Sequence, residues 1–474
     1  MNTANWIPDL FMKRVLADAQ WTLFSPDETP DLHHLYGSAF EERYEEYERA
    51  VDRGEIRLYK QMPAKTLWRK MLTMLYETGH PWITFKDACN VRSPQDHVGV
   101  VHSSNLCTEI TLNTSSDETA VCNLGSINLA RHVRDGHLDA DQLARTVRIA
   151  IRMLDNVVDI NYYPTDEAGA SNARWRPVGL GVMGLQDVFF RMRLPFDSTA
   201  ARVLSGQIAE EIYFNALSAS CDTAAVAGPH PAFSETRLAG GTFQFELAGL
   251  AVARTERWEE LRRRIVEHGV RNSLMIAIAP TATIASIAGA YECIEPQVSN
   301  LFKRETLSGE FLQINAYLVC DLQERGLWTD EVRDAVKRAE GSVQGIDVIP
   351  DDLKALYRTA WELPMRSLID MAAERGAFID QSQSLNLFIE SPTIGKLSSM
   401  YLHAWKQGLK TTYYLRSRPA TRITQTTTGP AASKDDTPVA GVSPIKSDLD
   451  AATVPDEAAV ACSLENPEAC EVCN

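Results

Sequence analysis

One cysteine in this chain lies between an amide and a carboxylate, and this group is the best suited to chemistry. Asn105, Cys107 and Glu109 occupy alternate positions in the stretch SNLCTEI, residues 104–110. In an extended segment they would share one face, and the mostly apolar residues between them would share the other. A carboxylate can accept a proton from a hydroxyl, an amide can orient a hydroxyl, and a thiol can give up a proton. The plain alternative is a packed structural cysteine beside surface polar residues.

Two further stretches carry possible redox or binding groups. Cys122 follows closely in AVCNLG, and Cys470 and Cys473 form the chain's one CxxC, which is typical of a redox pair. Residues 274–279 predict a buried strand that breaks at Pro280 and continues as a threonine-rich helix. Free N–H groups and the helix dipole at such a start favour an anion, although ordinary N-capping is the alternative.

Gly179, Gly181 and Gly184 spell GxGxxG, the pattern of a dinucleotide site. The preceding RWRP is not the apolar strand that such a site requires. We therefore expect these glycines to serve close helix packing.

Composition sets outer limits on the function. The chain has 474 residues and a net charge of −16, which argues against a nucleic-acid or anionic-membrane binder. The N-terminus lacks the basic and apolar regions of a signal peptide, so we expect a cytoplasmic protein. Nine cysteines at irregular spacing do not indicate a disulfide framework.

Periodicity predicts mostly helices with a few short strands. Helical spacing marks 39–47, 66–78, 145–163, 199–227, 255–268 and 394–409, and a strand is expected at 82–85. Strands joined by a polar loop are expected to carry Cys107 and Cys122. Cys89 and Cys221 are expected to be structural. From about Arg418 to Glu468 the composition predicts a disordered tail. At about 35–45 Å, its reach would let Cys470 and Cys473 visit a buried site.

Seven ordered words together identify the chain as similar to the large, catalytic (alpha) subunit of class I ribonucleotide reductase. They are SNLCTEI, AVCNLGSINLA, RPVGLGVMGLQD, APTATIA, QSQSLNLF, TTYYLR and CSLENPEACEVC, and the resemblance runs from about Trp6 to the C-terminus. The resemblance implies an α/β fold, part of a ten-stranded α/β barrel with a central finger loop. Residues 1–100 would be a mostly helical part of the barrel domain, 101–417 its later strands, and 418–474 a flexible tail with the redox CxxC.

The resemblance also implies roles. Cys107 would form a thiyl radical, Glu109 would accept a proton, and Asn105 would orient the sugar of a ribonucleoside diphosphate. The adjacent Tyr413 and Tyr414 would relay the radical, although a regular strand would point them to opposite faces. Cys122 would be one thiol of the reducing pair, and Cys470 and Cys473 would re-reduce it. Implied substrate-binding residues are Ser104, Asn105, Cys107, Glu109, Thr281, Ala282, Thr283 and Ile284.

The resemblance also implies partners that supply a radical and electrons to this chain. No cofactor or metal is expected on the chain. The radical would come from a metal-containing small (beta) subunit, and the electrons from thioredoxin or glutaredoxin. Neither a nucleic acid nor a membrane is an expected partner.

The sequence departs from the family pattern at the second reducing thiol, which should lie on a strand well upstream of SNLCTEI. Cys89 alone precedes Cys107, and its surroundings match a non-redox part of the pattern. We therefore expect a split subunit with a separate N-terminal half, or an inactive fragment that only binds partner subunits. A self-sufficient minimal enzyme is a further possibility. A cysteine hydrolase using Cys107 is another alternative, but no histidine has a recognisable partner motif.

Overall fold

The computed structural model describes residues 3–252, 255–306 and 309–418. Short strands recur along the whole of this length. Their bounds are β1 Ala4–Ile7, β2 Gln20–Phe24, β3 Tyr59–Pro63, β4 Trp82–Phe85, β5 Asn123–Asn128, β6 Val133–Arg134, β7 His137–Leu138, β8 Val178–Met183, β9 Leu301–Thr306, β10 Gly309–Ile314, β11 Leu387–Glu390 and β12 Leu415–Arg418.

Helices connect and cover these strands. Their bounds are α1 Asp9–Leu16, α2 Gly37–Asp52, α3 Ala64–Thr78, α4 Lys86–Val91, α5 Ala140–Ile160, α6 Asp166–Trp175, α7 Leu185–Arg191, α8 Thr199–Ala227, α9 Gln244–Leu247, α10 Thr255–His268, α11 Ala282–Ala288, α12 Ala316–Glu324, α13 Asp330–Arg338, α14 Asp351–Leu356, α15 Met365–Gly376 and α16 Ile394–Lys406. Single 3-10 turns lie at Leu32–His34, Asp96–Val98, Leu129–His132, Phe233–Glu235 and Ala360–Glu362. No described helix combines the length and the apolar character needed to span a bilayer.

A run of hydrogen-bonded extended segments forms the centre of the molecule. β5 pairs in parallel with β8, and single parallel bridges join Leu180 to Ile276 and Ile278 to Gln383. β11 then pairs in parallel with β12, and an antiparallel bridge between Thr411 and Thr84 adds β4, which pairs with β1. The spatial order is therefore β5, β8, 275–278, 382–390, 411–418, β4 and β1. This is an α/β arrangement, whereas closure into ten strands is not shown.

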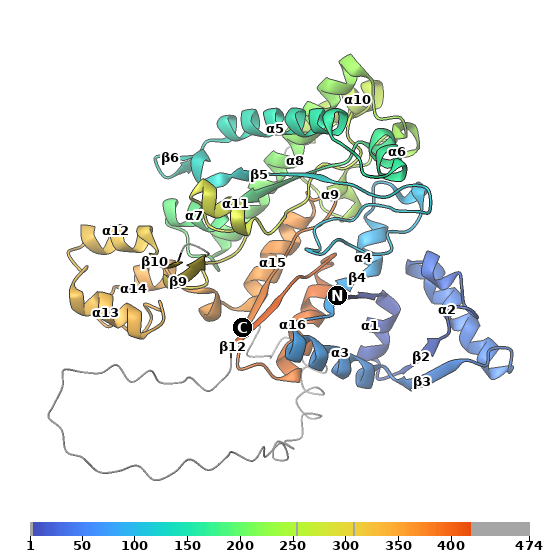
Figure 1. Cartoon of the computed structure of the whole chain (residues 1–474), viewed down its shortest axis with the longest axis horizontal. Helices are drawn as coiled ribbons and strands as arrows, with labels where there is room; N and C mark the ends of the chain where they lie inside the picture. Colours follow the sequence, from blue (N-terminus) through green and yellow to red (C-terminus); the bar gives the residue numbers. More distant parts are fainter. Residues whose placement is uncertain (1–2, 253–254, 307–308, 419–474) are drawn as a thin grey trace, which may run out of the picture.

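One large hydrophobic core supports this run of strands. Helices α5 and α8 pack against each other, and α5 also packs on β5 and β8. Figure 1 shows two peripheral parts on opposite sides, α2 with β2 and β3 on one and α12 to α14 on the other. The second part has its own small core, which includes Leu318, Leu322, Val336, Leu353 and Tyr357. The peripheral parts lie away from the central strands.

Several predicted elements are confirmed, with adjusted faces and ends. The helix predicted at 199–227 is α8 with the same bounds, the one at 255–268 is α10, and the strand at 82–85 is β4. The helix predicted at 66–78 is α3, and its fully buried stripe includes Trp68, Leu72 and Leu75. The last helix ends at Lys406 rather than at residue 409.

The glycine prediction was wrong about the packing partner. Gly179 and Gly181 lie within strand β8, not in a loop or a helix contact. A Cβ on Gly179 would come within 2.5 Å of Leu124 Cδ2, and one on Gly181 within 2.7 Å of the Ala277 carbonyl. These glycines therefore let neighbouring strands approach closely.

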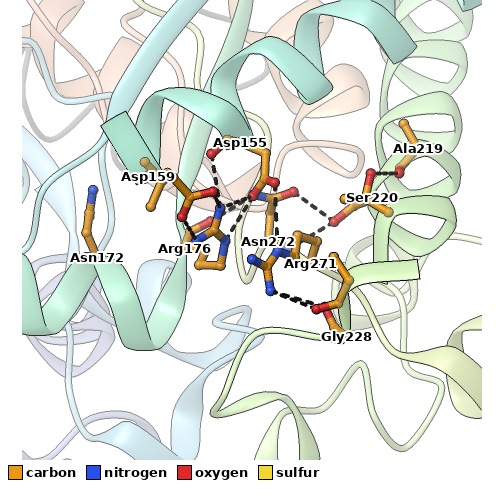
Figure 2. A network of polar contacts seen from close by, with 12 residues as sticks. Asp155, Asp159, Asn172, Arg176, Ala219, Ser220, Gly228, Arg271 and Asn272 are labelled. Atoms are coloured by element: carbon orange, nitrogen blue, oxygen red, sulfur yellow. Dashed lines mark hydrogen bonds and ion pairs between the residues drawn. The ribbon is translucent and has the colours of Figure 1, made fainter. Parts of the chain in front are cut away.

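A buried polar network fixes the helices to this sheet (Figure 2). The Arg176 guanidinium donates to Asp155 Oδ1 at 3.0 Å and to Asp159 Oδ1 at 2.6 Å, both on α5. Asn272, just before the 274–279 segment, donates to Asp155 Oδ1 at 2.9 Å and accepts from Ser220 of α8 at 2.9 Å. The network thus joins α5, α8, the start of β8 and the extended segment that leads to Pro280, which makes single bridges and not the regular strand predicted at 274–279.

The predicted tail lies almost wholly outside the described residues. Arg418 ends β12, so the first tail position belongs to a strand. Cys470, Cys473 and the disorder predicted around 419–468 lie outside the described residues and stay predictions.

Candidate functional site

The segment that carries Cys107 is a turn, not the predicted strand. The Thr108 N–H donates to the Asn105 carbonyl at 3.2 Å, and Thr108 has a φ of 66°. Leu106, which alternation would have pointed into the core, is 57% exposed. Cys122 also precedes its strand, because β5 begins at Asn123. The alternation argument was therefore wrong, and the tertiary structure must bring the three polar groups together.

Three successive carbonyls of this turn are held by hydroxyls and an amide from neighbouring segments. Ser384 Oγ donates to the Cys107 carbonyl, Thr411 Oγ1 donates to the Thr108 carbonyl at 2.8 Å, and the Ser382 N–H donates to the Glu109 carbonyl at 2.9 Å. All three donors are buried. The turn is thus bonded at each residue to the 382–390 and 411–418 segments, which fixes the position of the thiol.

The thiol of Cys107 lies beside a tyrosine hydroxyl. Tyr413 Oη donates to Cys107 Sγ at 3.5 Å. Burial raises the pKa of the Cys107 thiol, the nearby Glu109 charge raises it further, and the Tyr413 hydrogen bond lowers it. Burial also raises the pKa of the Tyr413 phenol. Both groups therefore stay protonated at neutral pH, which suits transfer of a hydrogen atom and not of a lone proton.

Glu109 is the buried carboxyl of the site. It is 2% exposed, and Ser384 Oγ, whose single proton is shared with the Cys107 carbonyl, also donates to its Oε2 at 3.3 Å. Burial raises its pKa, while hydrogen bonds from Asn105 and Ser384 lower it. The Asn105 side chain also accepts from the Ile110 N–H at 3.2 Å. Asn105, Cys107 and Glu109 are therefore brought together, with Asn105 on the exposed side.

Cys122 belongs to the same neighbourhood. Gln381 Nε2 lies 3.6 Å from Cys122 Sγ and donates to the Val178 carbonyl at 3.0 Å. Burial raises the pKa of Cys122 to about 12, and the charge of Glu109 contributes to this rise. A Cβ on Gly179 would be 3.0 Å from the sulfur. The thiol is therefore held between β8 and Gln381 in its protonated form.

The two adjacent tyrosines form a close ring pair. The Tyr413 and Tyr414 centroids are 4.2 Å apart, with an interplanar angle of 45°. Trp82 of β4 contacts both rings, at centroid distances of 5.0 and 5.6 Å. The pair runs from Cys107 toward Arg416, whose guanidinium is 5.9 Å from the Tyr414 ring. The two rings thus pack together, although adjacent residues of a regular strand would point to opposite faces.

The threonine-rich loop begins next to the site. The Ile278 carbonyl accepts from the Ser384 N–H at 2.9 Å, so the segment that leads to Pro280 borders the residue that contacts Glu109. Thr281 is buried, has a φ of 56° and accepts from the Cys293 N–H at 2.8 Å. Ala282, Thr283 and Ile284 form the exposed first turn of α11. The first N–H groups of a helix have no acceptor within it, as an anion site would require.

Sequence reasoning missed four residues of the site: Trp82, Gln381, Ser384 and Asn386. The sequence signal that could have found the last three is the polar run QSQSLN (381–386), which is entirely buried in the structure. Buried polar residues must find hydrogen-bond partners, and the residues of this run bond to the Cys107 turn and to the 411–418 segment.

Comparisons with known proteins agree on one family. The family model "Ribonucleotide reductase, barrel domain" matches residues 1–415. The ribonucleoside-diphosphate reductase subunit alpha of Chlamydia pneumoniae is 50% identical over 89% of this chain and 42% of its own length. The large chain of Schizosaccharomyces pombe is 43% identical over 99% of this chain and 59% of its own length.

A solved structure gives the same result. The alpha subunit of the Actinobacillus ureae class Id ribonucleotide reductase matches with a TM-score of 0.61 and 29% identity, over 75% of this chain and 61% of that one. The chain spans about half the length of the curated relatives it matches. Matching the barrel domain along most of its length, the chain belongs to the ribonucleotide reductase family, and it corresponds to a C-terminal portion of the class I large subunit.

Proposed function

We propose that this chain carries the centre for thiyl-radical reduction of ribonucleoside diphosphates to 2′-deoxyribonucleoside diphosphates. The observation that carries the proposal is the 3.5 Å contact between the Tyr413 hydroxyl and Cys107 Sγ, at the end of the tyrosine pair. A radical that reaches Tyr413 from a small subunit can take the hydrogen atom of the thiol directly. Glu109 and Asn105 then lie where a ribose must be handled.

The steps balance with the groups at hand. The Cys107 thiyl takes the 3′ hydrogen atom, Glu109 accepts the 3′-hydroxyl proton, and Asn105 orients the sugar hydroxyls. The 2′-hydroxyl leaves as water. A pair of thiols supplies two electrons and two protons, of which one ends on water and one on C2′, and the pair becomes a disulfide. Cys107 returns its hydrogen atom to C3′, and Glu109 returns the proton to the 3′ oxygen.

Cys122 would be one of the two reducing thiols. Cys89 is a poor second thiol, because it is buried, donates to the Lys410 carbonyl at 3.5 Å, and has a pKa raised by burial to about 12. The second thiol would then come from a separate N-terminal half of the large subunit. Cys470 and Cys473 would re-reduce this disulfide by exchange and form a disulfide themselves, which thioredoxin or glutaredoxin would then reduce.

The substrate and the remaining partners follow from the same site. Thr281, Ala282, Thr283 and Ile284 would hold the diphosphate through N–H groups and hydroxyls, and Ser104 would line the sugar site. A metal-containing small subunit would supply the radical. The N-terminal half would complete a ten-stranded barrel around the Cys107 turn as its finger loop. The division at residues 100 and 417 and a cytoplasmic location stay predictions.

The hydrolase alternative is disfavoured by the electrostatics of the thiol. A nucleophilic cysteine needs a lowered pKa and an adjacent base. The pKa of Cys107 is raised, and the hydrogen-bond partner of its sulfur is a tyrosine.

The test is reduction of cytidine diphosphate with a class I radical subunit and thioredoxin. Each assay is run with and without the polypeptide encoded upstream of this chain, and with Cys107→Ser as the inactive control. Turnover only with both halves supports a split reductase. Turnover by the chain alone would overturn the assignment of a second thiol to another polypeptide. Absence of turnover in both mixtures favours a fragment that only binds partners.

A further inference from the structure

The extended segment that carries the tyrosine pair, directly before β12, contains a one-residue bulge. β11 and β12 pair with Leu387 opposite Leu415, and the Leu387 N–H donates to the Tyr414 carbonyl at 3.0 Å. In that parallel register the Tyr414 N–H should reach the Leu385 carbonyl. Instead the Tyr413 N–H donates to Leu385, at 2.8 Å. Two residues, Tyr413 and Tyr414, therefore oppose the single residue Asn386.

This bulge explains how adjacent side chains can pack together. Successive residues of a regular strand point to opposite faces. An extra residue breaks that alternation and re-aims a side chain, a known use of bulges near active sites. The rings of Tyr413 and Tyr414 accordingly lie 4.2 Å apart.

The bulge frees one backbone N–H, and a side chain accepts from it. The Tyr414 N–H donates to Asn386 Oδ1 at 3.1 Å. The other end of that amide, Nδ2, donates to Glu295 Oε1. Asn386 is 2% exposed and Glu295 is 5% exposed, so neither group can exchange its partner for bulk water. Without Asn386 the freed N–H would lose its side-chain acceptor, which would destabilise the bulge.

Glu295 can hold Asn386 in either ionisation state. Burial raises the pKa of Glu295 to about 7, while Arg416 and the Asn386 hydrogen bond lower it. A carboxyl oxygen accepts a hydrogen bond whether or not the other oxygen carries a proton. The orientation of the Asn386 amide is therefore fixed across neutral pH.

We propose that Asn386 and Glu295 are positioning residues that hold the Tyr413–Tyr414 bulge and so set the ring contact of the pair. The functional value of this contact rests on the relay assigned under the proposed function. The structural claim does not, because it concerns the ring geometry of the chain by itself. Packing by Trp82 alone is the competing explanation for the ring contact.

The experiment places 3-fluorotyrosine at position 414 of the full chain and measures its ¹⁹F chemical shift. The ring-current contribution of Tyr413 is the shift difference between this chain and the same chain carrying Tyr413→Leu. We expect this difference to persist in Glu295→Gln, which keeps an acceptor, and to collapse toward zero in Asn386→Leu and Glu295→Leu.

The control is Asn300→Leu, which removes a buried amide that lies just before β9 and donates to the Gly341 and Tyr357 carbonyls of the α12–α14 part. It should destabilise the chain without moving the fluorine signal. A full shift difference in folded Asn386→Leu would overturn the proposal and favour Trp82. If that variant does not fold, Glu295→Leu decides by the same criterion.

Turnover separates this proposal from the relay. In an active assembly, Asn386→Leu should lower kcat by about a hundredfold with little change in KM, because a misplaced reacting group costs about that much. A collapsed shift difference with unchanged turnover would keep the positioning role and reject the relay.

Discussion

At the scale of single residues, the site keeps its thiols protonated, whereas hydrogen bonds to its one carboxyl oppose the effect of burial. Cys107, Cys122 and Glu109 all have raised pKa values because burial disfavours their charged forms. Ser384 counters this effect at Glu109 by donating to its carboxylate. This balance suits the proposed function, in which hydrogen atoms move and one carboxylate accepts a proton.

The opposing effects of burial and of the Ser384 hydrogen bond on the pKa of Glu109 predict a shift in the pH dependence of turnover. Under the proposed function, Glu109 must be ionised to accept a proton, so kcat should fall as the pH drops through its pKa, which lies above the usual 4.5. Ser384→Ala removes a hydrogen bond to the charged form, which raises this pKa further. The acidic limb of the kcat profile should therefore move to higher pH.

The measurement is the pH profile of kcat in the reconstituted assembly, with circular dichroism at each pH to exclude unfolding. Glu109→Gln serves as control and should have little activity at any pH. An acidic limb that stays in place or moves to lower pH in Ser384→Ala would contradict the assignment of Glu109 as base.

At the scale of elements, the closeness of two strands determines where Cys122 lies. β8 has glycine at the two positions that face Leu124 and Ala277, and side chains there would collide with neighbouring strands. The polar network around Arg176 then fixes where β8 begins. Strand spacing and strand start are thus set by different residues.

Gly179→Ala should displace Cys122 and destabilise the fold. The new Cβ would be 3.0 Å from Cys122 Sγ and 3.1 Å from Ala277 Cβ. Such overpacking costs about 1–3 kcal/mol. Urea denaturation measures the stability, and residue-resolved alkylation measures exposure of the Cys122 thiol, which should increase.

Gly206→Ala is the matched control, since this glycine lies in α8 with no atom within 4 Å of its Cβ position. It should gain about 1 kcal/mol from helix propensity. Equal effects of the two substitutions would show that the β8 contact is unimportant.

Arg176→Met should be strongly destabilising. The Arg176 side chain is 5% exposed and Asp155 is 7% exposed, so the change leaves a buried carboxylate without its main partner. Breaking such a pair costs about 3–5 kcal/mol. Arg263→Met removes an exposed ion pair with Glu260 and should change stability by no more than about 0.5 kcal/mol. The free energy of unfolding in urea compares them, and similar values would refute the structural role of the network.

At the scale of the whole molecule, the central run of strands ends in two edges. Among the described residues, β5 pairs with β8 alone and β1 pairs with β4 alone. Their outer N–H and C=O groups can pair with further strands. Under the proposed split subunit, the N-terminal half would fill both edges.

Hydrogen exchange can test this assembly. Amides of β1 and β5 should become protected when the upstream polypeptide is added, because new strands would bond to them. β8 is bonded to neighbours on both sides and provides the internal control, with little expected change. Unchanged exchange at β1 and β5 in a complex that forms would show that the halves do not join at these edges.

The sequence by itself determined the family, the helices α8 and α10 and strand β4, and it singled out Asn105, Cys107 and Glu109 as candidate site residues, because motifs and periodicity are local. Tertiary structure decided how those residues meet. Hydrogen bonds from Ser382, Ser384 and Thr411 hold a turn where alternation predicted a strand. A bulge opposite Asn386 brings Tyr413 and Tyr414 together. The turn depends on partners about 300 residues away in the chain, and the bulge depends on the register of the neighbouring strand β11. No local sequence pattern encodes such contacts.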